Sequence, residues 1–137
     1  MTAAGYSGTP LARKLGIKPA CRLCVLGDAP ADYAQWLAPL PPGIVIESTP
    51  GAATDIAHLF ATDAVELQRE LVRLRRVLKP GAALWVSWPK KASKVPTTIT
   101  ENTVRELALP LGWVDIKVCA VTEVWSGLEL VVRKELR

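Results

Sequence analysis

Three lysines lie close together directly after an almost unbroken apolar run. Lys90, Lys91 and Lys94 follow residues 82–88, which include two tryptophans. Such a run is typical of a strand that is covered on both faces. The carboxyl end of a central strand is where an α/β domain usually keeps its ligand site. We therefore predict that these lysines bind a phosphate or another anion, assisted by the hydroxyl-rich helix start over residues 98–103. The alternative is that the lysines lie in an ordinary solvent-exposed loop and bind no ligand.

Carboxylates and the histidine offer weaker indications of chemistry. His58 is the only histidine, and it lies within an apolar strand pattern without an obvious partner, so we interpret it as a satisfied core residue. Asp28, Glu47 and Asp55 could approach one crevice and carry out acid–base chemistry. The sequence shows no evident Ser-His-Asp triad or similar arrangement of catalytic residues.

The cysteines do not predict a metal or redox site. Cys21 and Cys24 are three residues apart at the start of a predicted strand, where such spacing turns side chains to opposite faces. No second cysteine pair or histidine cluster could complete a tetrahedral metal site. Three cysteines are also too few for a disulfide framework. We expect buried structural cysteines and a reducing, cytoplasmic location.

Length and composition fit one domain over residues 1–137, with residues 1–8 as a flexible arm. The net charge of +4 is mild and does not by itself indicate nucleic acid as a partner. No apolar run approaches the roughly 20 residues of a membrane span, and the first twenty residues lack a signal-peptide core. We therefore expect no membrane partner.

Helix and strand patterns alternate along the chain. Helices are expected over residues 10–16, 33–37, 63–78 and 98–109, and strands over 22–27, 44–46, 55–60, 82–88, 113–121 and 128–134. Asp63 should cap the longest helix and Thr98 the next, the latter through a capping box with Glu101. A short connection around residues 125–127 forces the last two strands to be antiparallel. The order predicts an α/β fold with three layers and a mostly parallel six-stranded sheet containing one antiparallel strand.

The succession of elements resembles a reduced methyltransferase-like Rossmann fold. The segments LKPGAALWVS (residues 78–87) and TDIAHLF (residues 54–60) carry this resemblance. It implies the strand order 2-1-3-4-6-5, with the last strand inserted antiparallel.

A closer resemblance is to a bacterial domain family of unknown function. Its motifs stand here as YSGTPLARKLGIK (residues 6–18), LWVSWPKKAS (84–93), VCAV (118–121) and WSGL (125–128). This resemblance runs nearly from end to end, and it implies a fold rather than an activity.

The methyltransferase resemblance implies a site for S-adenosylmethionine at Gly27, Asp28 and Glu47. A glycine-rich turn after the first strand lets the backbone approach the cofactor, and a carboxylate after the second strand holds the ribose. Only one glycine of the expected set is present, and Pro30 removes an amide donor. The cofactor is therefore not favoured.

We predict a non-catalytic module that binds a small molecule or anion, or a protein partner. Its site should lie at the carboxyl edge of the sheet and consist of Gly27, Asp28, Glu47, Lys90, Lys91 and Lys94. One alternative is an S-adenosylmethionine-dependent methyltransferase with a degenerate cofactor turn. Another is a weak nucleic-acid binder that uses Lys90, Lys91 and Lys94 together with the basic helix face over residues 69–76. A homodimer through the second strand or the terminal hairpin is a further expectation. No metal site is predicted.

Overall fold

The computed structural model describes residues 10–137, so the predicted arm over residues 1–8 lies outside the described part of the chain. The elements follow the chain as α1 (Leu11–Lys14), β1 (Arg22–Gly27), α2 (Tyr33–Trp36), β2 (Val45–Glu47), β3 (Ile56–Phe60), α3 (Ala64–Val77), β4 (Ala83–Pro89), α4 (Glu101–Ala108), β5 (Trp113–Ala120) and β6 (Trp125–Val132). Short 3₁₀ turns lie at Lys91–Ser93, Leu109–Leu111 and Lys134–Leu136. Among these described helices, none is long and apolar enough to cross a membrane.

The six strands form one sheet in the order β2-β1-β3-β4-β6-β5. β1 pairs in parallel with β2 and β3, and β3 pairs in parallel with β4. β6 is antiparallel to both of its neighbours, β4 and β5. This arrangement confirms the predicted α/β class, the strand order and the inserted antiparallel strand. The strand order reverses between β1 and β3, which is the switch point where open α/β sheets usually bind ligands.

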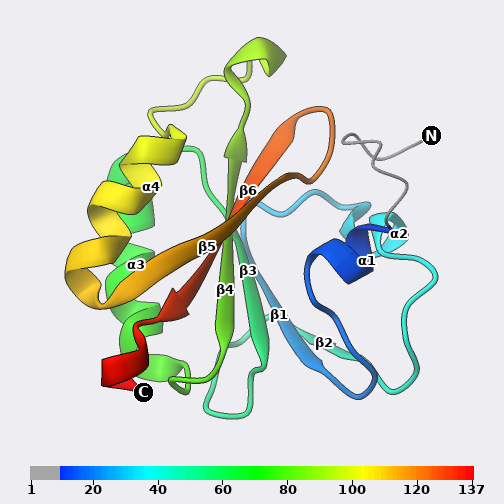
Figure 1. Ribbon diagram of the computed structural model, residues 1–137. Coiled ribbons are helices and arrows are strands. Elements are labelled where there is room, and N and C mark those ends of the chain that lie inside the picture. Colours follow the sequence, from blue (N-terminus) through cyan, green and yellow to red (C-terminus); the bar gives the residue numbers. More distant parts are fainter. Residues whose placement is uncertain (1–9) are drawn as a thin grey trace.

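Helices lie on both faces of the sheet, as predicted for three layers. Helices α3 and α4 cover one face, and α1 and α2 lie against the other (Figure 1). Alternation along β4 sends Leu84 and Val86 into the core beneath α3, while Trp85 enters the core beside α1. The two cysteines divide in the same way, because Cys24 belongs to the first core and Cys21 to the second. Both are buried free thiols, as expected.

Helix α3 begins and packs as its sequence predicts. Asp63 accepts a hydrogen bond from the backbone N–H of Glu66 at 3.0 Å. Leu67, Leu71 and Leu74 are completely buried against the sheet, and their 4-3 spacing places them on one face of the helix.

The predicted cap of α4 was wrong by two residues. Thr100 is the N-cap, and it exchanges hydrogen bonds with Thr103 in a capping box. Thr98 instead accepts a hydrogen bond from the N–H of Ala64 at 2.8 Å. The hydroxyl that the sequence assigns to α4 therefore serves the first turn of α3.

The predicted hairpin connection was also misplaced. Trp125 and its two successors belong to β6, and the chain turns over residues 121–124. Thr122 stabilises the turn, because its hydroxyl accepts hydrogen bonds from the N–H groups of Val124 and Trp125, both at 3.1 Å.

Candidate functional site

The lysine segment forms a tight turn at the carboxyl end of β4. The 3₁₀ turn begins at Lys91, and the N–H of Lys94 donates to the Lys91 carbonyl at 3.2 Å. The hydroxyl of Ser93 donates to the Lys90 carbonyl at 2.7 Å and accepts from the N–H of Val95 at 3.2 Å. Lys94 has a left-handed backbone conformation, with φ of 63°. These contacts fix the path of the chain between the lysines.

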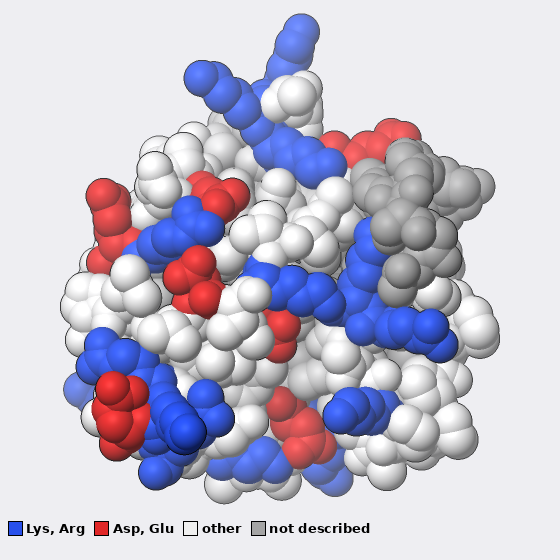
Figure 2. All heavy atoms as spheres, viewed as in Figure 1, with Lys and Arg blue, Asp and Glu red and all other residues white. Residues whose placement is uncertain are grey.

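A hollow of about 440 Å³ lies beside this turn, within the range of small-molecule sites. Its lining residues are Trp88, Pro89, Lys91, Lys94, Val95, Pro96, Thr97, Ile99, Thr100 and Glu101. Basic side chains project from the tip of the molecule above β4, at the top of the view in Figure 2. Lys90 does not line the hollow, and its backbone N–H donates to the carbonyl of Val124 at 2.7 Å. The structure therefore places two of the three predicted lysines at one cavity.

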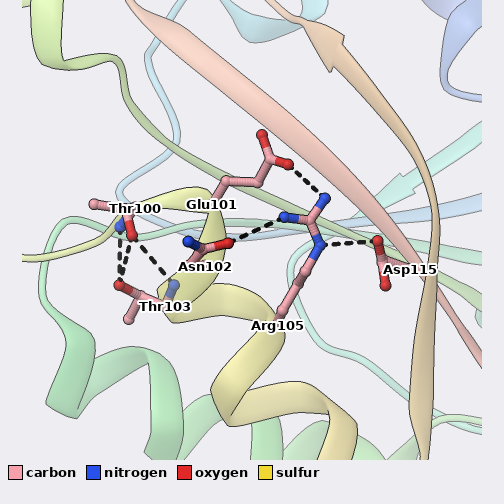
Figure 3. Close-up of polar contacts among 6 residues, drawn as sticks. All are labelled: Thr100, Glu101, Asn102, Thr103, Arg105 and Asp115. Carbon is pink, nitrogen blue, oxygen red and sulfur yellow. Dashed lines mark hydrogen bonds and ion pairs between the residues drawn. The ribbon is translucent and has the colours of Figure 1, made fainter.

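Most polar groups around the hollow already have partners within the protein. The hydroxyl of Thr97 donates to the Thr62 carbonyl at 2.8 Å and accepts from the N–H of Ile99 at 3.0 Å. The Glu101 carboxylate forms an ion pair with Arg105, which also donates to Asp115 at 2.9 Å. Figure 3 shows the carboxylate and the guanidinium directed toward each other, beside the paired Thr100 and Thr103.

Lys91 and Lys94 differ from these groups. Both side chains are exposed, and neither forms an ion pair with any residue in the range 10–137. The hollow therefore combines two uncompensated positive charges with a wall that is largely apolar. Sequence reasoning found the charges but missed that wall, although the proline, valine and isoleucine after the lysines were an available signal.

Gly27 has a structural reason for its identity. Its φ is +77°, and a Cβ atom at this position would lie 2.1 Å from the carbonyl oxygen of Phe60. The N–H of Asp28 donates to that same carbonyl at 2.9 Å. The close approach of β3 therefore requires glycine at position 27, and no cofactor is needed to explain this residue.

Glu47 does not lie level with the glycine turn. It ends β2, as predicted, but in the parallel register it stands opposite Cys24, three residues before Gly27. At about 3.3 Å per residue, the offset along the strands is roughly 10 Å. The Glu47 carboxylate forms an ion pair with Arg22, at the amino end of β1. Sequence patterns could not reveal this offset, because strand register depends on tertiary pairing.

Asp55 contradicts the expectation of a single acidic crevice. It immediately precedes β3, accepts from the N–H of Arg22 at 2.9 Å and pairs with Lys79 at 2.6 Å. The Lys79 hydrogen bond, followed by that from the Arg22 backbone, lowers the pKa of this carboxyl. Asp55 and Glu47 thus lie near Arg22, whereas Asp28 is at the opposite end of β1.

His58 has two buried partners that sequence reasoning missed. Its Nδ1 lies 2.8 Å from the hydroxyl of Tyr33, and its Nε2 lies 2.7 Å from the hydroxyl of Ser87. Burial lowers the pKa of His58 to about 3 and raises the pKa of Tyr33. The ring is therefore neutral near pH 7. A signal existed, since His58 and Ser87 are the polar residues of two otherwise apolar strands.

The expectation of a satisfied core histidine is thus confirmed, with partners now identified. Because all three residues of this network are at least 95% buried, a substrate has no direct access to the Ser87 hydroxyl. Among residues 10–137, no cluster of three or more histidine, cysteine or acidic side chains could hold a metal ion.

Comparisons with known proteins establish the fold. No family model and no curated protein sequence matches this chain. A SAM-dependent methyltransferase from Aquifex aeolicus matches with a TM-score of 0.65 and 17% identity, over 89% of this chain and 88% of that one. Fibrillarin from Aeropyrum pernix, solved with natively bound S-adenosyl-L-methionine, matches with a TM-score of 0.60 and 12% identity, over 88% and 73%. The chain thus has the predicted methyltransferase-like Rossmann fold.

Proposed function

We propose that this protein binds a small anionic ligand in the hollow beside β4, without catalysing a reaction on it. The observation that carries the proposal is the pair Lys91 and Lys94 at the rim of a 440 Å³ hollow, without acidic partners in the described chain. The carboxyl edge of the sheet is also where α/β proteins usually hold ligands, although the hollow lies beside β4 and not at the switch point between β1 and β3. Cationic side chains there raise the local concentration of anions.

A second candidate is S-adenosylmethionine-dependent methyl transfer, which the structural neighbours favour. The cofactor's expected contacts would come from Gly27, Asp28 and Glu47. Two observations count against this arrangement: Glu47 is roughly 10 Å short of the glycine turn along the strands, and Phe60 alone accounts for the glycine. We therefore rank methyl transfer second.

Nucleic-acid binding has less support from the basic helix. On α3, Arg69 lies 3.8 Å from Glu66, and Arg73 lies 2.7 Å from Glu70. Such pairs reduce the positive potential of this face and so weaken its attraction for phosphates.

A homodimer remains a prediction with two candidate surfaces. The β2 edge exposes Val45 and Ile46, and the β5 edge exposes Ile116 and Val118. Both strands end the sheet and have unpaired backbone groups on their outer side.

Calorimetric titration can separate the two leading functions. The ligands are inorganic phosphate, S-adenosylmethionine and S-adenosylhomocysteine, each tested on the wild type and on a Lys91→Gln, Lys94→Gln double variant. A Lys18→Gln, Lys134→Gln variant is the matched control, because it removes two exposed lysines outside the hollow.

We expect phosphate binding in the wild type and the control, and its loss in the Lys91→Gln, Lys94→Gln variant. Lys90→Gln should have little effect, because Lys90 does not line the hollow. Binding of S-adenosylmethionine that disappears in Glu47→Ala would favour methyl transfer instead. Equal phosphate binding in both double variants would contradict the hollow as the anion site.

A further inference from the structure

The wall of the hollow indicates more than a free inorganic ion. Trp88 and Ile99 form part of the lining and are only 5% and 2% exposed. Val95, also in the lining, is 39% exposed, and Pro96 adds a further apolar surface. A bare phosphate at the lysines would leave this wall in contact with water. A ligand with an apolar part could cover it and gain hydrophobic free energy.

The polar groups of the hollow select the charge of the ligand. Glu101 pairs with Arg105, which it shares with Asp115, and the hydroxyls of Thr97 and Thr100 hydrogen-bond within the protein. Lys91 and Lys94 are left as two positive charges, three residues apart on one turn. A phosphate monoester carries close to two negative charges at pH 7, whereas a carboxylate carries one. A dianion therefore matches the two lysines better.

We infer that the ligand is a phosphate monoester joined to a compact apolar group, with the phosphate at Lys91 and Lys94 and the apolar group against Val95 and Pro96. This inference rests on the proposed function, because it uses the same hollow as the anion site. The hollow's volume of about 440 Å³ admits a small organic phosphate.

Phenyl phosphate is a suitable probe, compared by calorimetry with inorganic phosphate, benzoate and phenol. We expect phenyl phosphate to bind about tenfold or more tightly than inorganic phosphate, because its ring buries apolar surface. Benzoate should bind more weakly than phenyl phosphate, and phenol should show no binding.

Two variants test the contact with the apolar wall. Val95→Ser should lower the affinity of the protein for phenyl phosphate several-fold and leave its affinity for inorganic phosphate unchanged. Val65→Ser is the matched control, since Val65 is an exposed valine outside the hollow, and it should change neither affinity. The Lys91→Gln, Lys94→Gln variant should bind neither phenyl phosphate nor inorganic phosphate.

The outcomes distinguish this inference from the function on which it rests. Equal affinities for phenyl phosphate and inorganic phosphate, both lost in the lysine variant, would overturn the ligand class and leave anion binding intact. Tighter binding of benzoate than of phenyl phosphate would likewise overturn the preference for a dianion. Absence of binding by every probe to the folded wild-type protein would overturn both proposals.

Discussion

The carbonyl oxygen of Phe60 lies where it would be 2.1 Å from a Cβ atom on residue 27. The same carbonyl accepts the N–H of Asp28, so the pairing of β3 with β1 continues just beyond the glycine. A glycine after the first strand of this fold can therefore be required by the neighbouring strand alone. In this chain it is not by itself a sign of a cofactor.

Gly27→Ala should destabilise the protein strongly. The added Cβ meets backbone rather than a flexible side chain, and the positive φ adds strain. We expect a loss of at least about 2 kcal/mol in the free energy of unfolding, measured by urea denaturation. Gly16→Ala is the control, because Gly16 also has a positive φ but has open space around its Cβ position, and it should lose only about 1 kcal/mol. Equal losses would contradict the steric explanation.

Glu47→Gln should have a small effect on stability. Glu47 and Arg22 form an ion pair whose side chains are 23% and 44% exposed, and such pairs contribute at most about 1 kcal/mol. Phosphate affinity should not change, because neither residue lines the hollow. Urea denaturation and phosphate titration measure the two effects. A large rise in phosphate affinity, as expected where loss of the carboxylate frees Arg22 for an anion, would show that the anion binds near β2 instead.

The sequence predicted the elements and their order better than it predicted the site. Strand β1 was predicted at its observed bounds, Arg22–Gly27, because its apolar run is closed by glycine. The sheet order followed from the resemblance to a known fold together with one short connection. Glu47 was correctly placed at a strand end, but the strand's register against β1 sets it level with Cys24.

The incorrect assignment of Thr98 and the unpredicted partners of His58 have the same physical origin. Thr98 was assigned to the wrong helix because a hydroxyl can accept from any N–H that the fold brings near it, and here that is the N–H of Ala64. The partners of His58 lie 25 and 29 residues away in the chain. Local patterns identify such residues as polar and buried but do not specify their contacts.

Thr100→Ala should destabilise α4, because Thr100 is its N-cap and pairs reciprocally with Thr103. Loss of an N-cap hydroxyl typically costs about 1 kcal/mol. Thr100→Ser should recover most of the loss, since serine retains the hydroxyl. Urea denaturation of both variants provides the measurement. If alanine and serine have the same effect, the capping bond is not what threonine contributes here.

His58 should make stability fall as the pH is lowered from 7 to 5. Its folded-state pKa is lowered to about 3 by burial, whereas the unfolded value is near 6.5. Protons therefore bind the unfolded chain preferentially, and the stabilising contribution is complete above pH 6.5 and lost as the pH falls toward 3. By pH 5 the folding equilibrium constant should fall about 30-fold from this residue alone, or about 2 kcal/mol.

Comparison of the wild type with His58→Gln isolates this contribution. Both proteins have the same carboxylates, and His58 is the only histidine in the chain. The glutamine side chain does not titrate, so the variant, although less stable at pH 7 because its buried polar contacts change, should lose less stability between pH 7 and pH 5. Urea denaturation at half-unit steps of pH gives both curves. Parallel curves would mean that His58 can be protonated in the folded protein, and that burial does not keep it neutral.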